Sequence, residues 1–199
     1  MSGVHTRCMH PSESLLDPSY TVPEPPLGTT GVAWLQSHVP RFSEGDAHAR
    51  LRSQVDDVLA ELTVESVPGE EPTACLLRAF GLPAEAKADI GLIAECYHPH
   101  QPATPAADAA VERMLVEIGG RTEATAAKIC ILVQAHAGTQ ALIRVLREGE
   151  QRAPVPFTRR VRSDGVTVEV SLDDAHFGRG PHACPGEALG RRLAEEALR

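Results

Sequence analysis

The stretch from Thr122 to about Glu148 constrains the fold of this 199-residue chain more than any other feature. Its apolar residues recur at helical spacing, and Gly149 follows at the position where helices commonly end. At 1.5 Å per residue such a helix extends about 40 Å, which is enough to cross a small domain. Its predicted buried face consists of Ile129, Leu132, Val133, Leu142, Ile143 and Leu146. We therefore expect a fold that is organised around one long helix.

Shorter elements are expected on either side of this helix. Helical spacing and capping signals predict helices over residues 47–62, 73–80, 83–95, 108–118 and from 185 to the C-terminus. Asp46 and Asp108 are the expected N-caps of the first and fourth of these helices. Strand-like runs cover residues 154–161 and 166–170. The expected fold class is mainly α with minor β.

The N-terminal 30 residues differ from the rest of the chain. They hold five of the 16 prolines and show no apolar periodicity, so we expect residues 1–30 to form an extended, turn-rich segment. Residues 31–199 are then expected to form a single domain. The segment Gly28–Val39 is expected to be a variable loop.

Charge and cysteine content limit the classes of function and the cellular compartments that this chain suits. The chain carries 19 Lys and Arg against 27 Asp and Glu, a net charge of −8, which argues against binding to nucleic acid or to a membrane surface. No apolar run approaches the ~20 residues that a membrane span requires. The N-terminus lacks the apolar segment of a secretory signal, and five scattered cysteines do not suggest a disulfide framework. We therefore expect a cytoplasmic protein with reduced thiols.

The most informative segment is Phe177-Gly-Arg-Gly-Pro-His-Ala-Cys-Pro-Gly-Glu-Ala-Leu-Gly-Arg191. Its glycines allow a tight loop that lies close to a flat, bulky group. Cys184 directly precedes the predicted C-terminal helix, where free N–H groups and the helix dipole stabilise a thiolate. A thiolate that is held by a rigid loop suits axial ligation of haem iron.

This segment resembles the ligand loop of the cytochrome P-450 family of haem-thiolate monooxygenases, F-G-x-G-x-H-x-C-x-G-x-x-L-[AG]-R, at every fixed position. The resemblance, to a strongly shortened member of bacterial type, implies a contracted form of the family's helical fold. It implies haem b with Cys184 as the ligand of the iron and His182 on a propionate, within a cofactor-binding loop that includes Phe177, Gly178 and Gly186. The alternative is a structural cysteine beside a hydrogen-bonded histidine.

Two other segments resemble propionate-binding parts of the same family. His48 and Arg52 match an H-x-x-x-R pattern and lie on one helix face, four residues apart. Pro154–Arg160 resembles the strand that supplies another propionate arginine; Arg160 is the first choice and Arg159 the alternative. Without the cysteine loop, both segments could also be solvated charged surface.

Two motifs of the family are altered here. Its members are about twice as long, and a helix with E-x-x-R braces the core behind the haem. In this chain Arg152 lies four residues after Glu148 and two after Glu150, so neither pair has that spacing. The ion pair is therefore absent or rebuilt.

The second altered motif lies in the long helix. The family has A-G-x-[DE]-T-[TS] there, with an acid and an alcohol that relay protons. In this chain Ala137 stands at the acid position and Gly138 at the alcohol position, with Thr139 one place late. Neither alanine nor glycine can donate a proton. His136 and Thr139 are the candidate catalytic residues, with Gln134 as a further polar side chain, although a single helix histidine is more often a packed residue.

The resemblance implies a monooxygenase-type oxidoreductase that acts on a small organic molecule in secondary metabolism. Electrons would come from a ferredoxin and its reductase. Two alternatives stay open: a haem-binding isomerase, dehydratase or peroxide-dependent catalyst, and a non-catalytic accessory relic. Whether a partner or a homo-oligomer covers the haem also stays open. A zinc site at Cys96–His100 is the less favoured interpretation of that loop, because a fourth ligand is missing.

Overall fold

The protein is described by a computed structural model that covers residues 9–199. The helices of the described chain are α1 (Gly31–Ser37), α2 (Gly45–Glu61), α3 (Pro72–Ala79), α4 (Ala86–Cys96), α5 (Pro105–Ile118), α6 (Glu123–Glu148) and α7 (Glu187–Glu196). The strands are β1 (Tyr20–Thr21), β2 (Phe157–Arg162) and β3 (Thr167–Ser171), and short 3-10 helices η1 (Ser12–Leu16), η2 (Pro40–Phe42) and η3 (Gly180–His182) complete the list. The expected mainly α fold with minor β is confirmed.

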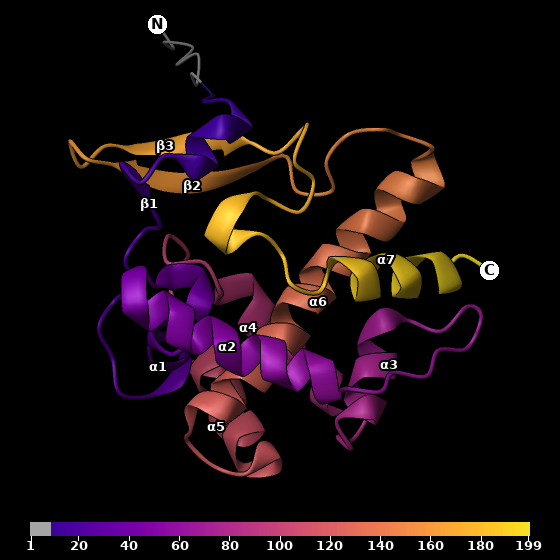
Figure 1. Ribbon diagram of the computed structural model, residues 1–199. Helices are drawn as coiled ribbons and strands as arrows, with labels where there is room; N and C mark the ends of the chain where they lie inside the picture. The colour runs from indigo at the N-terminus through magenta and orange to yellow at the C-terminus, as the bar shows by residue number, and fades with distance from the viewer. Residues whose placement is uncertain (1–8) are drawn as a thin grey trace, which may run out of the picture.

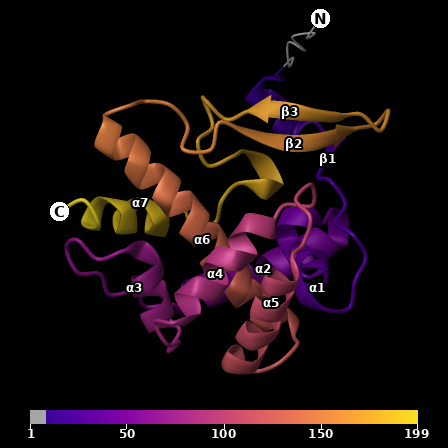
Figure 2. The ribbon, with the colours of Figure 1, turned by 180° about the vertical axis from the view of Figure 1, so that it is seen from behind.

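Helix α6 runs through the middle of the helical part, as predicted. It contacts α2, α3, α4, α5 and α7. Figures 1 and 2 show it from both sides, with the small sheet at one end of the molecule and α2 crossing α6. By length and composition alone α6 could cross a membrane, and 39% of its most apolar window is buried inside the protein.

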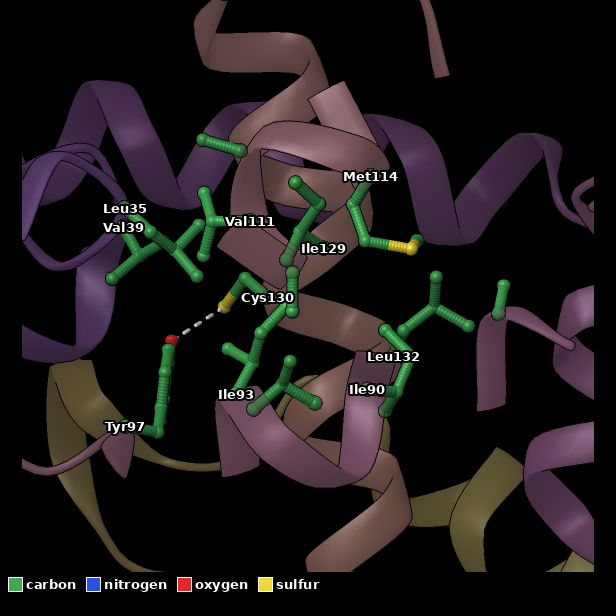
Figure 3. Packing of buried hydrophobic residues seen from close by; sticks show 14 of the residues in the cluster. Leu35, Val39, Ile90, Ile93, Tyr97, Val111, Met114, Ile129, Cys130 and Leu132 are labelled. Carbon is green, nitrogen blue, oxygen red and sulfur yellow. Dashed lines mark hydrogen bonds between the residues drawn. The ribbon is translucent and has the colours of Figure 1, made fainter. Parts of the chain in front are cut away.

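The main core forms where α4, α5 and α6 meet. Ile90, Ile93, Met114, Ile129 and Leu132 are completely buried there, as Figure 3 shows. Their removal from water is the main stabilising contribution, about 1.5–3 kcal/mol for each large apolar side chain. The core thus fixes α6 in place and leaves the opposite side of this helix available to other elements.

The sheet is antiparallel with the order β1-β2-β3. Tyr20 pairs with Arg162, and Arg160 pairs with Val168. Because alternate residues of a strand face opposite sides, Thr158 and Arg160 share one face while Arg159 lies on the other. Residues 9–30 therefore contribute a strand to this sheet, although the domain boundary predicted at residue 30 stays a prediction and residues 1–8 lie outside the described chain.

Helix α1 corrects the expectation of a loop over Gly28–Val39. The Val32 N–H donates to Asp108 Oδ1 at 2.9 Å, and the Gly31 N–H donates to Glu112 Oε1 at 2.9 Å. Two carboxylates of α5 thus satisfy the free N–H groups of α1, a long-range interaction that gives no local sequence signal. Gly31 has φ +57°, and a Cβ there would collide with Asp108.

Two predicted N-caps are also corrected. Asp108 accepts from α1 instead of capping its own helix; the Thr104 hydroxyl caps α5 by accepting from the Ala107 N–H at 3.1 Å. Asp46 lies in the first turn of α2, whose N-cap residue is Glu44. An acidic side chain in the first turn still interacts favourably with the helix dipole.

Candidate functional site

A cavity of about 330 Å³ lies between α2, α6, the sheet and the segment that precedes α7. This volume is at the lower end of the range of small-molecule and cofactor sites. All of the predicted cofactor-binding residues line it: His48, Arg52, Arg160, Phe177, Gly178, His182, Cys184 and Gly186. Residues from distant parts of the sequence are thereby brought to one place, and we refer to residues 177–186 as the cysteine loop.

Backbone hydrogen bonds and glycine close the cysteine loop. The Cys184 N–H donates to the Phe177 carbonyl at 2.8 Å. Gly178 has φ +78°, a conformation that other residues rarely adopt, and a Cβ there would lie 3.5 Å from the His182 carbonyl oxygen. The Arg191 guanidinium lies over the Phe177 ring at 4.4 Å. The loop is therefore fixed at both ends.

The Cys184 side chain is exposed to the cavity, and helix α7 begins at Glu187, after the predicted Pro185. Burial among the surrounding protein atoms raises the pKa of this thiol, and the Gly186 N–H and the charges of Arg52 and Arg41 offset the rise only in part. The helix terminus alone suggested a stabilised thiolate, but burial outweighs it. A bound metal cation would reverse this balance, because a coordinated thiol is deprotonated.

Arg52 connects α2 to the cysteine loop. Its guanidinium donates to the carbonyl oxygens of Ala183 at 2.8 Å and Pro181 at 3.2 Å, and it also donates to Asp56 at 2.9 Å. Arg52 lies four residues after His48 on α2, and these hydrogen bonds attach α2 to the backbone of the cysteine loop. This contact gives Arg52 a structural role in addition to the predicted contact with a propionate.

His48 and His182 pack against each other beside the loop. Their ring centroids are 4.1 Å apart, and His182 Nε2 lies 3.4 Å from Glu44 Oε2. Burial lowers the pKa of His182 to about 4 and also lowers that of His48. At neutral pH both rings are uncharged and can donate a hydrogen bond without carrying an uncompensated charge into the cavity.

Arg160 is the buried cation of the site. It is 8% exposed and donates only to the Thr158 hydroxyl at 3.1 Å and the Arg159 carbonyl at 2.9 Å. Within residues 9–199 no carboxylate lies within ion-pair distance of it, and burial, together with the charge of Arg41, lowers its pKa to about 10. Arg159 does not line the cavity and lies 3.7 Å from Glu169. The strand thus presents Arg160, the first choice, to the cavity.

The cavity lining is strongly unbalanced in charge. Its arginines are Arg41, Arg52, Arg160 and Arg179, and no aspartate or glutamate of the described chain is among the lining residues. Asp56 and Asp174 neutralise Arg52 and Arg179 from outside the lining. Two guanidinium groups therefore remain without an ion-pair partner in residues 9–199, in a protein of net charge −8.

The α6 side of the cavity contains few free polar groups. Thr139 lines the cavity, but its hydroxyl donates to the Ala135 carbonyl at 2.6 Å. His136 does not line the cavity; its Nδ1 lies 2.9 Å from the Thr73 hydroxyl. Ala137 and Gly138 do line it, and a Cβ on Gly138 would meet no atom within 4 Å. We therefore assign no role at the cavity to His136.

Several lining residues escaped the sequence analysis as binding residues. Arg41 comes from η2, Tyr97 and His98 from the end of α4, and Cys130 from α6. The Tyr97 hydroxyl donates to Cys130 Sγ at 3.3 Å (Figure 3). Arg41, Tyr97 and His98 carry no periodic signal of their own, because only the packing of η2 and of the end of α4 brings them close to α6. In residues 9–199 no group of three or more potential metal ligands occurs, so the zinc interpretation of Cys96–His100 gains no support.

Residues 148–152, which stand where the family has its E-x-x-R helix, lie at the surface. Arg152 forms ion pairs with Glu148, at 2.9 Å, and with Glu150, and all three side chains are more than 40% exposed. Exposed pairs of this kind contribute little to stability. They do not replace an ion pair in the core behind a cofactor.

Comparison with known proteins gives matches in structure alone. No family model and no curated sequence matches the chain. The fold is similar to that of P450BioI, which was solved in complex with an acyl carrier protein ligated to hexadec-9Z-enoic acid. The TM-score is 0.62, and the sequences are 17% identical over 94% of this chain and 81% of that chain. It is also similar to CxnD, a cytochrome P450 enzyme for C–S bond formation in chuangxinmycin biosynthesis, with a TM-score of 0.56 and 14% identity over 94% of this chain and 76% of that chain. The expected contracted cytochrome P-450-like fold is therefore confirmed.

Proposed function

We propose that this protein is a haem-thiolate oxidoreductase of the cytochrome P-450 type, which binds haem b with Cys184 as the ligand of the iron. One observation carries the proposal: a single cavity gathers an accessible thiol and every predicted propionate-binding residue. The cytochrome P-450-like fold is in keeping with it.

The residues of the cavity fit this cofactor. Haem offers iron, a broad apolar ring and two carboxylates. The lining offers a soft sulfur ligand, many apolar side chains and two guanidinium groups, of Arg41 and Arg160, that have no ion-pair partner within residues 9–199. The space beside Gly138 and Gly186, where a Cβ would meet no atom within 4 Å, also suits a bulky group. The set thus matches haem in ligand type and in charge.

Each residue would have a defined task. Cys184 would ligate the iron, and the cysteine loop would keep water away from the sulfur. Arg160, His48 and His182 would bind the propionates, since charge-assisted hydrogen bonds to carboxylates are strong. Arg52 holds the loop through the carbonyls of residues 181 and 183. Bound haem would supply the redox-active iron for oxidation of a small organic substrate.

Proton supply from α6 distinguishes two versions of this function. No acid stands at residue 137 or 138, and the Thr139 hydroxyl is bonded to its own helix. A monooxygenase driven by a ferredoxin and its reductase would therefore be poorly coupled. This observation favours, as the second candidate, a haem catalyst that uses peroxide or performs an isomerisation or dehydration. An acyl group attached to a carrier protein, as in the complex of P450BioI, would extend the substrate class beyond free small molecules.

A spectroscopic experiment tests the proposal. Haemin is added to the purified protein, and the difference spectrum of the reduced, carbon monoxide-bound form is recorded for the wild type, Cys184→Ala and Cys75→Ala. Cys75 is a buried cysteine outside the cavity and serves as the matched control. We expect the red-shifted Soret band of a thiolate complex in the wild type and in Cys75→Ala, and its loss in Cys184→Ala. A wild type that takes up no haemin, or a Cys184→Ala variant with the same spectrum, would contradict the proposal.

A further inference from the structure

Residues 10–20 form a surface loop whose two ends lie side by side. The Tyr20 hydroxyl and His10 Nδ1 are hydrogen-bonded at 3.1 Å, and the two rings meet edge to face with centroids 5.5 Å apart. Each end is also attached to the sheet, because the His10 N–H donates to the Glu169 carbonyl at 2.8 Å and Tyr20 pairs with Arg162. A compact loop with closed ends is an Ω-loop, a type of segment that frequently carries function.

The tip of this loop is η1, which forms part of the cavity wall. Leu15 lines the cavity, is only 9% exposed and packs with Val170 and Leu172. Helix η1 contacts both β3 and η3, and Figures 1 and 2 show it against the sheet. The loop therefore covers a side of the cavity that residues far away in the sequence complete.

The same tip meets the cysteine loop. A Cβ on Gly180 would lie 3.0 Å from Leu16 Cδ2 and 3.4 Å from the Leu15 carbonyl oxygen, so a side chain at residue 180 would push η1 away. Gly180 also has φ +65°, which favours glycine. The loop of residues 10–20 and the cysteine loop thus fit against each other at one edge of the cavity.

The tip is held less firmly than the two ends. In the described chain, the backbone hydrogen bonds of residues 11–17 stay within the loop; the Ser14 N–H, for example, donates to the Pro11 carbonyl at 3.1 Å. The tip is anchored to the rest of the protein by the buried side chains of Ser12 and Leu15. Segments with few buried contacts and few long-range hydrogen bonds open at a lower cost than the core does. The tip can therefore move while the two ends stay on the sheet.

We propose that residues 10–20 are a lid over the haem cavity, which opens about His10 and Tyr20 to admit the cofactor and retains it when closed. This inference rests on the proposed function, since it concerns entry to the same cavity. Leu15 is the residue that closes the lid. Because the same opening precedes entry and exit, a weaker lid speeds both haem uptake and haem release. A residue that only contacts bound haem would instead change release alone.

The kinetics of haemin binding test the lid. Uptake is followed by absorbance after rapid mixing, and release by transfer of haemin to excess apomyoglobin. The variants are Leu15→Ala and Tyr20→Phe, of which the second removes the hydrogen bond between the two ends and keeps the ring. The control is Val64→Ala, at an equally buried residue outside the cavity. We expect both rates to rise at least about fivefold in Leu15→Ala and about twofold in Tyr20→Phe, and to stay unchanged in Val64→Ala.

Proteolysis gives a second measurement that does not depend on haemin kinetics. Glu13 is an exposed residue of the tip, so a protease that cleaves after glutamate reports on opening. Bound haemin should slow this cleavage in the wild type, and Leu15→Ala should speed it in the haemin-free protein.

Other results would overturn the inference, and they separate it from the proposed function. Faster release with unchanged uptake in Leu15→Ala would make Leu15 a contact of bound haem only, and unchanged rates in both variants would show that the loop does not control entry. Either result leaves the haem proposal standing. If the wild type takes up no haemin, the proposed function fails, and cleavage after Glu13 then decides the lid. Faster cleavage in Leu15→Ala than in Val64→Ala would support it, and equal cleavage would overturn it.

Discussion

The cysteine loop and helix α6 line the same cavity but present different chemistry to it. The loop side offers an accessible thiol, a histidine pair and a buried arginine without an ion-pair partner in the described chain. On α6, the Gln134 side chain donates to Cys130 Sγ at 2.8 Å and Thr139 donates to its own helix. Groups on the loop side are thus available to a ligand, while polar groups on α6 are largely bonded within the protein.

If the proposed function holds, this difference separates haem binding from reactivity. Binding of haem needs a ligand for iron and partners for two carboxylates, all of which lie on the loop side. Oxygen activation needs a proton donor on the other side, where Ala137 and Gly138 stand. The comparison therefore predicts that changes on the loop side alter affinity and stability strongly, and that changes on α6 alter them slightly.

The largest effect is expected for Arg160→Met. Burial of an unpaired charge costs stability, so the haemin-free variant should be more stable than the wild type by about 1–3 kcal/mol. Haemin affinity should fall by about tenfold to a hundredfold, because a charge-assisted hydrogen bond is worth about 1.5–3 kcal/mol. Urea unfolding and haemin titration measure the two effects, with Arg162→Met, at a half-exposed arginine of the same strand outside the cavity, as control. A loss of stability in Arg160→Met would mean that this charge already has a partner.

The pH dependence of stability tests the histidine pair. The pKa of His182 is about 4 in the folded protein, against 6.5 in an unfolded chain. Between pH 6.5 and 4 the ring is therefore largely protonated in the unfolded state and largely neutral in the folded state. The free energy of unfolding should therefore decrease as the pH falls from about 6.5 to 4, by about 2–3 kcal/mol from this residue.

Urea unfolding of the haemin-free protein between pH 7.5 and 4.5 measures this decrease. His182→Gln removes the titrating ring, so its stability should depend less steeply on pH than that of the wild type. Arg144→Gln, at an exposed arginine outside the cavity that does not titrate in this range, should keep the wild-type slope even if its absolute stability changes. Parallel curves for the wild type and His182→Gln would mean that burial of the His182 ring does not affect its protonation.

Arg52→Gln tests the support of the cysteine loop. The variant loses the hydrogen bonds to the carbonyls of residues 181 and 183, so stability should fall by about 1–2 kcal/mol. The control is Arg50→Gln on the same helix, whose exposed ion pair with Glu123 contributes less than about 1 kcal/mol. Proteolysis within residues 177–186, measured beside urea unfolding, should become faster in Arg52→Gln only. Equal effects of both substitutions would show that the loop does not depend on α2.

The sequence predicted the local features of this molecule better than the long-range ones. Periodicity located α2 to α7, although the N-caps predicted at Asp46 and Asp108 were wrong. The loop motif identified Cys184 and His182, which the structure places at the cavity. Helix α1 escaped because its N–H groups are satisfied by Asp108 and Glu112, which follow about 80 residues later. Arg41 and His98 escaped for the same reason: only the packing of η2 and the end of α4 against α6 makes them neighbours of the cavity. For His136 the sequence located the residue on α6 correctly but did not predict that its side chain faces Thr73 instead of the cavity.

The smallest effect is expected on α6, for Gly138→Ala. Gly138 has ordinary helical geometry, and glycine inside a helix is less favourable than alanine by about 0.5–1 kcal/mol. Because an added Cβ would meet no atom within 4 Å, the variant should gain this amount in the free energy of unfolding without strain. The added methyl group would lie in the cavity, so haemin affinity should change by less than about threefold if α6 only borders the cofactor space.

The control is Ala141→Gly, outside the cavity on the same helix, which should lose a similar amount of stability and leave haemin affinity unchanged. A large loss of haemin affinity in Gly138→Ala would show that the ring packs directly on α6, so that this side of the cavity also determines cofactor binding.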